Sequence, residues 1–300
     1  LRGILILSLP LPECLSGRRG GACQAKGNDM RLEKWNTPEG PRWSVDGQFL
    51  ARSFHLAQLL RLPSEQGRLL LDSLRTDRPT SGVPMAPLDE HHEVWAAGVT
   101  YLTSRDARQA ESTEADFYAR VYESERPELF FKSPGWRVVG HGGLIRKRSD
   151  SRWDVPEPEL SLVVNSQQEI IGYCAGNDVS SRSIEGENPL YLPQGKVYRG
   201  SCALGPGIEL AISADLRELP VELEIARRGK TIFSASVNTS RMKRTPAELV
   251  SFLFRELDFP DGVFLMTGTG IVPPPEYTLQ PGDRVRIAVG SLTPVSYTHL

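Results

Sequence analysis

Two glutamates and one aspartate are spaced so that their side chains could share a cation. Glu157 and Glu159 flank Pro158, and Pro156 stiffens the segment further. Alternate side chains of an extended chain point to the same face, so we expect the two carboxylates to lie side by side. Like charges held together repel unless a cation lies between them or one of them is protonated. Asp178, at the end of the next apolar segment, is the expected third carboxylate.

Three carboxylates with no neighbouring histidine or cysteine favour a hard cation. Mg²⁺ is the expected metal, with Mn²⁺ and Ca²⁺ as alternatives. A Glu-x-Glu pair taken alone is also typical of the solvated face of an edge strand, and this plain interpretation is the better one for the pair by itself. The other motifs of the chain must therefore decide between a metal site and a charged surface.

Strands are the main elements expected to position these residues. Leu160, Leu162 and Val164 alternate with their neighbours at a period of two, which predicts a strand directly after the glutamates. Similar patterns predict a buried strand over Glu93–Tyr101 and later strands over Val263–Thr267 and Arg284–Val289. Two further strands, at Val221–Ala226 and Thr231–Val237, are expected to form a hairpin around Gly229.

Two helices are predicted between the strands. Tyr118, Val121 and Tyr122 recur at helical spacing, which predicts a short helix over Ala115–Glu123 that could cover a site. Thr245, Pro246 and Glu248 have the pattern of a capping box with proline in the first turn. We expect the second helix to continue to Pro260.

The chain is expected to contain two folded units and two foreign ends. Residues 30–88 are predicted to form a small amino-terminal domain, and residues 89–294 the main domain, after a loop rich in proline, serine and glycine. Residues 1–29 show no sustained periodicity and are expected to be a disordered or non-native leader. Residues 295–300 (VSYTHL) resemble a translated sequencing adapter and are expected not to be native.

Composition favours a small-molecule partner. The net charge is −2 and the pI is about 6.3, so no overall field would attract nucleic acid or an anionic membrane. No apolar run reaches the roughly 18 residues that span a bilayer. The four cysteines form no CxxC pair, which predicts reduced thiols in a cytoplasmic protein (Cys14, Cys23, Cys174 and Cys202).

Several separated motifs resemble the fumarylacetoacetate hydrolase superfamily in residue type, order and spacing. They are the segment Glu157–Asp178, then Asn177-Asp178-Val-Ser-Ser-Arg182, Lys196 and Thr267-Gly268-Thr269-Gly270. The resemblance implies a mixed α+β, β-rich fold with a β-roll core, short helices and a small amino-terminal domain. It also implies that the three carboxylates bind the metal, and that the arginine and the lysine face the substrate.

A narrower resemblance points to one branch, the 2-keto-3-deoxy-D-arabinonate dehydratases. Its motifs lie at residues 126–132, 139–142, 148–150, 185–198, 236–239 and 268–273. This resemblance implies a homodimer or homotetramer that acts on a small 2-keto acid. We expect Lys196 to be the catalytic base, and Glu128 to protonate the departing hydroxyl group or to assist the later tautomerisation. The expected substrate-binding residues are Arg182, Asn188, Tyr191 and Thr269.

Lys196 and Glu128 each have a plainer interpretation. Most lysines are solvated surface charges, but a lysine beside a cation and partly dehydrated is expected to have a lowered pKa and to supply a neutral amine. Glu128 could instead cap a helix or pair with Arg126. We prefer the catalytic interpretation for Lys196 because of the motif Leu192-Pro-Gln-Gly-Lys196, and we keep Glu128 as a catalytic candidate beside its plainer interpretation.

One departure from the wider superfamily bears on the reaction. Its carbon–carbon hydrolases carry a histidine shortly after the first strand of the main domain, and Ser104 stands at that position here. Serine has no group that titrates near neutral pH and cannot act as a general base. His91 and His92 are expected at the surface, and His141 could either reach the site or have a structural role in a loop. The missing histidine favours elimination over hydrolysis.

We therefore expect a dehydratase that converts a 2-keto-3-deoxy sugar acid, such as 2-dehydro-3-deoxy-D-arabinonate, to 2,5-dioxopentanoate through a metal-stabilised enolate. The alternative is a hydrolase, decarboxylase or isomerase of the same superfamily that acts on an acylpyruvate-like diketo acid. A third interpretation is a binding protein without activity. The joint presence of the three carboxylates, Lys196 and the loop around Thr269 argues against this third interpretation.

Overall fold

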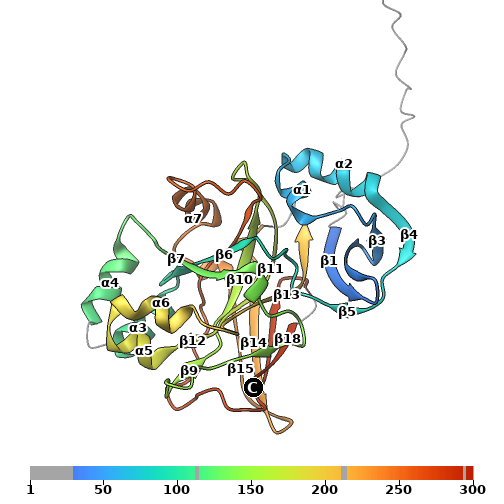
Figure 1. Ribbon diagram of the computed structural model, residues 1–300. Helices are drawn as coiled ribbons and strands as arrows, with labels where there is room; N and C mark the ends of the chain where they lie inside the picture. The colour runs from blue at the N-terminus through green and yellow to red at the C-terminus, as the bar shows by residue number, and fades with distance from the viewer. Residues whose placement is uncertain (1–29, 112–114, 211–214, 293–294, 300) are drawn as a thin grey trace, which may run out of the picture.

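The computed structural model describes residues 30–111, 115–210, 215–292 and 295–299, and the expected leader lies outside them. The described strands form a sheet of 11 strands, a sheet of five and a sheet of two (Figure 1). In spatial order the large sheet contains β4 (Arg75–Pro79), β3 (Gln48–Leu50), β2 (Gly40–Val45), β1 (Met30–Thr37), β13 (Cys202–Leu210), β11 (Ile170–Asp178), β10 (Pro158–Val164), β16 (Val263–Met266), β6 (Glu93–Gly98) and β7 (Glu128–Pro134), with β5 (Val83–Pro84) paired to β1.

Strand β10 lies in the middle of this sheet and is buried on both faces. Leu160 and Leu162 face a core shared with the five-stranded sheet, and Val163 faces a second core shared with the amino-terminal helices. The predicted alternation is thus correct, and each face has its own apolar partner. A strand enclosed on both sides is a rigid support for the carboxylates at its beginning.

The five-stranded sheet packs on one face of the large sheet. The predicted hairpin is present, and its turn places Gly229 at a φ of +77°, a conformation that suits glycine. The last strand pairs with both of its neighbours and covers most of the predicted non-native tail. In spatial order the strands are β15 (Lys230–Asn238), β14 (Pro220–Arg227), β17 (Arg284–Val289), β18 (Val295–His299) and β8 (Leu144–Ile145).

The amino-terminal strands continue the large sheet. β1 pairs antiparallel with β13, so Met30 lies opposite Leu210, and the helices α1 (Leu56–Leu60) and α2 (Ser64–Leu74) cover this end. Leu56, Leu60 and Leu71 of these helices are fully buried in the second core. The amino-terminal segment is therefore joined to the main sheet by backbone hydrogen bonds as well as by apolar packing.

The remaining helices gather beside β6 and β7, except for α7, which lies apart (Figure 1). The helix predicted over Ala115–Glu123 is confirmed with these bounds. A neighbouring helix over Leu102–Glu111 was missed because its sequence is too polar for an apolar period to stand out. The group comprises α3 (Leu102–Glu111), α4 (Ala115–Glu123), α5 (Arg182–Glu187) and α6 (Leu192–Lys196).

The described residues also contain three short 3-10 turns, which are η1 (Gly135–Arg137), η2 (Pro189–Tyr191) and η3 (Thr239–Arg241). The two-stranded sheet is formed by β9 (Asp154–Val155) and β12 (Ser180–Ser181), which pair antiparallel.

The structure corrects the length of the second predicted helix. α7 (Pro246–Leu253) begins at the expected capping box, in which Thr245 and Glu248 bond each other's backbone. It ends well before Pro260, because Phe254 leaves helical geometry and its ring packs against that of Phe259, with centroids 5.0 Å apart. Tertiary packing of an aromatic side chain thus stops the helix before the proline does.

The surface prediction for one histidine is also wrong. His91 is exposed, but His92 is only 2% exposed and packs edge-on against Phe264. Its Nδ1 accepts a hydrogen bond of 3.0 Å from the Asp89 backbone, and burial lowers its pKa to about 4. His92 is therefore a neutral core residue, because its ring lies in the turn before β6 and packs against Phe264 of β16.

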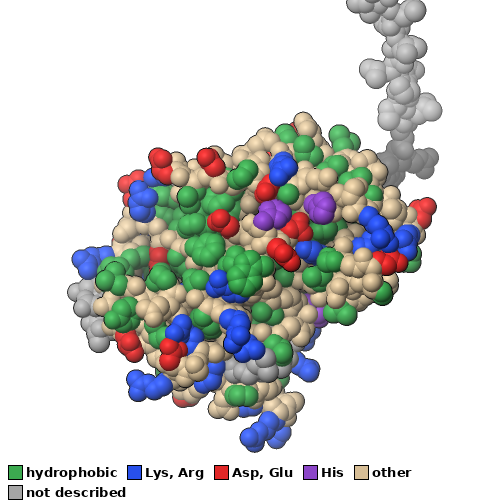
Figure 2. All heavy atoms as spheres, in the orientation of Figure 1, with side chains coloured by type: hydrophobic (Ala, Val, Ile, Leu, Met, Phe, Trp, Pro, Cys, Tyr) green, Lys and Arg blue, Asp and Glu red, His purple; other side chains and the backbone are tan. Residues whose placement is uncertain are grey.

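The distribution of charged side chains on the surface agrees with the small net charge of the chain. Acidic and basic side chains are interspersed over the face drawn in Figure 2, with apolar side chains between them. Among the described residues, no helix combines the length and the apolar character needed to cross a bilayer.

Candidate metal and catalytic site

Glu157, Glu159 and Asp178 come together at one end of the large sheet. β10 and β11 run antiparallel, and the Asp178 amide donates a hydrogen bond of 3.0 Å to the Glu157 carbonyl. One carboxylate oxygen of each residue lies within 4.8 Å of those of the other two. The three residues are 3%, 1% and 1% exposed. The expected convergence of these side chains is therefore present.

Backbone groups fix the orientation of this triad. The Gly268 amide donates a hydrogen bond of 2.6 Å to Glu159 Oε2, and the Glu157 amide donates one of 3.2 Å to Asn177. Gly268 has a φ of +93°, and a Cβ added there would lie 2.1 Å from Thr100 Oγ1. Only glycine allows the loop after β16 to approach the glutamate this closely.

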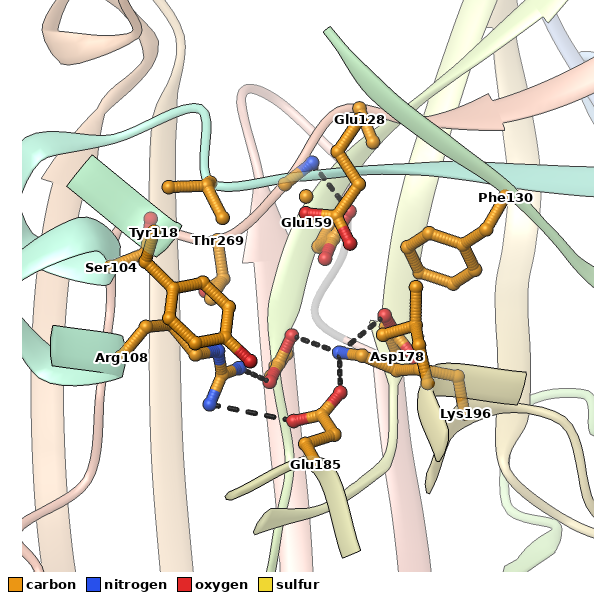
Figure 3. Close-up of a pocket in the computed structure, with 16 residues that line it drawn as sticks. Ser104, Arg108, Tyr118, Glu128, Phe130, Glu159, Asp178, Glu185, Lys196 and Thr269 are labelled. Carbon is orange, nitrogen blue, oxygen red and sulfur yellow. Dashed lines mark hydrogen bonds and ion pairs between the residues drawn. The ribbon is translucent and has the colours of Figure 1, made fainter. Parts of the chain in front are cut away.

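Four basic side chains surround the triad. Lys196 Nζ lies 2.8 Å from Glu157 Oε2 and 3.0 Å from Asp178 Oδ2 (Figure 3). Arg108 and Arg182 both approach the other oxygen of Glu157, at 2.6 and 3.0 Å.

The fourth basic side chain, Lys132 of β7, pairs with Asp178. Lys132 is completely buried and also donates hydrogen bonds to the carbonyls of Val179 and Lys196. These bonds tie the strand that carries Lys132 to the segment that carries Lys196.

Of the three carboxylates of the triad, Glu159 forms no ion pair with a basic side chain among the described residues. The nearest basic influence on it is the more distant charge of Lys196. Burial, followed by the charges of Asp178 and Glu157, raises its pKa well above the ordinary value. A buried acid in this position is stable either protonated or beside a cation. Three oxygen donors within reach of one point are the ligands that Mg²⁺, Mn²⁺ and Ca²⁺ prefer. The residues therefore fit a hard divalent cation.

The pKa of Lys196 does not fall as expected when only the groups of the protein act on it. Burial acts to lower this pKa, but the charges of Asp178, Glu157 and Glu185 together raise it well above the ordinary value. The expectation took account of a neighbouring cation but not of the several carboxylates around Lys196. One of these carboxylates is Glu185, which lies 3.3 Å from Lys196 Nζ. With these carboxylates ionised, Lys196 is an ammonium ion.

Glu128 extends from the start of β7 towards the triad (Figure 3). Its residue is partly exposed because it faces a cavity, yet the carboxyl group is enclosed by protein, and this burial raises its pKa to about 7. Gly98 lies opposite it on β6, and a Cβ there would come within 2.0 Å of Glu128 Oε2. The missing side chain at Gly98 leaves the space that this carboxyl group occupies.

A cavity extends from the triad between this end of the large sheet and the helices. It is lined by Lys196, Glu128 and Thr269 from the predicted set and by side chains of α3, α4 and α5. Three other predicted substrate-binding residues do not line it in this structure. Arg182 lies behind Glu157, Asn188 caps η2 by accepting a hydrogen bond from Leu190, and Tyr191 is 41% exposed.

Both the sequence and the fold of this chain are similar to those of known proteins. The model of the family described as fumarylacetoacetate (FAA) hydrolase, C-terminal, matches residues 93–298. The chain belongs to this family. Its sequence is 47% identical over 211 residues to the probable 2-keto-3-deoxyxylonate dehydratase of Haloferax volcanii, which spans 70% of this chain and 72% of the relative. It is 42% identical over 207 residues to the 2-dehydro-3-deoxy-D-arabinonate dehydratase of Saccharolobus solfataricus, which spans 67% and 69%.

Solved structures agree with the fold of this fumarylacetoacetate hydrolase family member. A 2-keto-3-deoxy-D-arabinonate dehydratase complexed with magnesium and 2,5-dioxopentanoate superimposes with a TM-score of 0.74 at 34% identity. The match covers 90% of this chain and 98% of that structure. The apo form of an enzyme of the same name gives a TM-score of 0.77 with the same coverage. The predicted β-rich α+β fold is confirmed.

At the position where the resemblance places the histidine of the hydrolases, this family member has Ser104. Ser104 is buried, lines the cavity and donates a hydrogen bond of 2.8 Å to the Tyr101 carbonyl. Among the described side chains, no histidine lines this cavity, and His141 lies in a separate groove beside Trp136.

Sequence reasoning missed several residues of this family member's site. Arg108 and Glu185 face each other at 3.4 Å and both line the cavity, as does Tyr118 of α4. Lys132 and Glu185 lie inside motifs that were noticed, without a role. Arg108 lies on the helix that was not predicted, one turn after Ser104, so its helical spacing from Ser104 was the available signal.

Proposed function

We propose that the chain is a Mg²⁺-dependent dehydratase of a 2-keto-3-deoxy sugar acid, such as 2-dehydro-3-deoxy-D-arabinonate, and that it forms 2,5-dioxopentanoate. The convergence of Glu157, Glu159 and Asp178 carries the proposal, because it provides a divalent site beside an acid and a lysine. The names of the two curated relatives and of the product-bound solved structure support the choice of substrate.

Glu157, Glu159 and Asp178 would hold the metal. Bound there, Mg²⁺ would act as a Lewis acid on the carboxylate and keto oxygens of a 2-keto acid, and would offset the carboxylate charges that keep the proton on Lys196. Lys196 Nζ is the proposed base that takes a proton from C3 of the substrate. Its short contact with Ser180, at 2.6 Å, together with its carboxylate partners fixes the position of this nitrogen.

Glu128 is the proposed acid. With a pKa of about 7, roughly half of Glu128 is protonated at neutral pH, and this form can donate its proton to the C4 hydroxyl as that group leaves as water. One proton leaves C3 and one reaches the leaving hydroxyl, so one water is lost in total. The remaining enone tautomerises to the aldehyde of 2,5-dioxopentanoate.

The other predicted contacts remain proposals. Thr269 lines the cavity, and it would contact the carboxylate end of the substrate. Arg182 would act through Glu157, which it contacts at 3.0 Å. Asn188 and Tyr191 lie on the segment between α5 and α6, and contact between them and a substrate requires that segment to shift toward the cavity.

A substrate panel tests the proposal. The protein is incubated with Mg²⁺ and 2-keto-3-deoxypentonates of both C4 configurations, and separately with acetylpyruvate, and 2,5-dioxopentanoate is measured by mass spectrometry. We expect the aldehyde from at least one pentonate and no cleavage of acetylpyruvate. Cleavage of acetylpyruvate alone would replace the dehydratase by the hydrolase alternative.

We further propose a cytoplasmic protein that acts as a homodimer or homotetramer, in line with the resemblance. Light scattering coupled to gel filtration measures the mass of the assembly. A mass equal to one chain of 33.3 kDa would contradict the oligomeric part of the proposal.

A further inference from the structure

Most polar side chains that line the cavity already have a partner within the protein. Ser104 Oγ donates its hydrogen bond to the Tyr101 carbonyl at 2.8 Å, and Thr269 Oγ1 donates to the Ile271 carbonyl at 3.2 Å. Arg108 pairs with two carboxylates of the site. These groups are held by the fold and have limited capacity left for a ligand.

Two lining side chains differ from the rest. Among the described residues, neither a hydrogen bond nor an ion pair reaches the carboxyl group of Glu128 or the hydroxyl group of Tyr118, although both line the cavity. The oxygens of Glu185 also accept no hydrogen bond, but they are ion-paired with Arg108 and Lys196. Tyr118 is 8% exposed, and its ring packs edge-on against Phe117 with centroids 5.8 Å apart. The ring enters the cavity from α4, with its hydroxyl toward the charged side chains (Figure 3). A buried tyrosine hydroxyl usually has a hydrogen-bond partner, so this one is available for a ligand.

The charge environment keeps this hydroxyl protonated. Burial, followed by the charge of Glu185, raises the pKa of Tyr118 to about 12. The hydroxyl is therefore neutral at physiological pH, and it can both donate and accept a hydrogen bond. A neutral group of this kind suits a substrate hydroxyl better than a substrate carboxylate, which Arg or Lys would bind more strongly.

We propose that the Tyr118 hydroxyl binds the C5 hydroxyl of the 2-keto-3-deoxy pentonate and selects for a hydroxylated end of the chain; this assignment rests on the proposed function. In that function the C1 and C2 oxygens face the metal and the C4 hydroxyl faces Glu128. The C5 hydroxyl is then the remaining polar group of the substrate. Among the described residues, Tyr118 is the remaining polar lining side chain that has neither a hydrogen bond nor an ion pair.

The assignment makes a specific statement about selectivity. A site that is built to hydrogen-bond a substrate hydroxyl discriminates against an analogue that lacks it. 4-Hydroxy-2-oxopentanoate is such an analogue, because it keeps the C4 hydroxyl that leaves and has a methyl group in place of the C5 hydroxymethyl group. The contribution of Tyr118 should therefore appear with the pentonate and disappear with this analogue.

Two matched variants test this. Tyr118→Phe removes only the hydroxyl oxygen, and Tyr122→Phe makes the same change one turn later on α4, where the ring lies beside Lys243 and Arg105 outside the cavity. We expect Tyr118→Phe to lower kcat/KM for the pentonate about tenfold, the usual size of one hydrogen bond. For 4-hydroxy-2-oxopentanoate it should change kcat/KM by less than about twofold, and Tyr122→Phe should leave both values unchanged.

The other outcomes overturn the assignment. An equal loss on both substrates would show that Tyr118 supports the fold or the chemistry in general, and no loss on either would show that its hydroxyl does not contact the substrate. The melting temperature and the Mg²⁺ response of Tyr118→Phe separate a folding defect from a binding defect. If the wild type dehydrates neither compound, the proposed function fails, and the assignment fails with it.

Discussion

Two buried charge clusters in this molecule have opposite character. Near the amino-terminal strands, Lys34 Nζ donates hydrogen bonds of 2.7 Å to Asp89 and to the Leu88 carbonyl, and the Leu56 amide donates one of 3.1 Å to the same aspartate. Burial alone would raise the pKa of Asp89, but these partners lower it overall. At the end of β10, burial and neighbouring carboxylates raise the pKa of Glu159.

The difference separates a structural cluster from a functional one. The Lys34–Asp89 cluster satisfies each charge with a partner of its own and needs nothing from solution. The carboxylate triad leaves Glu159 with one backbone hydrogen bond and two like-charged neighbours. A buried group that is destabilised in this way marks a place where a ligand is expected to complete the structure.

Removing one acid of the triad should have the largest effect. Glu159→Gln is expected to lower turnover roughly 10³-fold or more, because Lewis-acid stabilisation by a metal contributes several kcal/mol. The rise in melting temperature caused by Mg²⁺ should disappear, whereas the metal-free protein should melt no earlier than the wild type. Glu218→Gln, at an exposed position, is the matched control. An unchanged Mg²⁺ response in Glu159→Gln would refute the role of this residue.

Breaking the structural cluster should affect stability and leave the site intact. Lys34→Met leaves Asp89 buried without its partner and is expected to lower the free energy of unfolding by about 3–5 kcal/mol. Because the pKa of Asp89 is lowered in the folded wild type, the stability from this pair is present at neutral pH and is lost as pH falls through that pKa. Urea unfolding at neutral and acid pH should therefore show a difference between the two proteins that narrows in acid. A difference that widens would contradict the assignment.

The titration of Glu128, the proposed acid, should be visible in the dependence of activity on pH. Glu128→Gln is expected to lower kcat at least roughly 10²-fold, the usual contribution of a positioned acid. In the wild type the protonated form is the active one, so activity should fall as pH rises through about 7, the pKa of Glu128. The residual activity of the variant should lack this fall with pH. A variant that keeps the fall would assign it to another group.

The smallest effect is expected at the glycine that leaves room for this acid. Gly98→Ala places a methyl group 2.0 Å from Glu128 Oε2 and must displace the carboxyl group. We expect a loss in kcat of about tenfold, because small displacements of a reacting group are costly. In the Glu128→Gln background the same change should cost little more. Additive losses in the double variant would show that Gly98 acts elsewhere.

Much of the candidate metal site could be predicted from the sequence, because the relative positions of Glu157 and Glu159 depend on local backbone geometry. The alternation of Glu157 and Glu159 in a proline-stiffened segment placed both on one face, and the apolar period of β10 identified the supporting strand. The helix at Ala115–Glu123 and the capping box at Thr245 were also predicted from short patterns. The boundary proposed at residue 88 stays a prediction.

The rest depends on contacts between distant segments. Arg108 is 49 residues from Glu157 in the chain, and its helix is too polar to be recognised by period. The burial of His92 depends on Phe264, on a strand far along the sequence. The pKa of Lys196 depends on the charges of Asp178, Glu157 and Glu185, which lie on three separate segments. Spacing along the chain does not show that these segments meet.

Mn²⁺-loaded crystals would test the central claim most directly, because anomalous scattering locates the ion without reference to activity. We expect one peak that lies about 2.0–2.3 Å from oxygens of Glu157, Glu159 and Asp178, and that is lost when excess Mg²⁺ is added. An ion bound elsewhere, or a triad that keeps its lysine and arginine contacts and binds no ion at saturating Mn²⁺, would contradict the account.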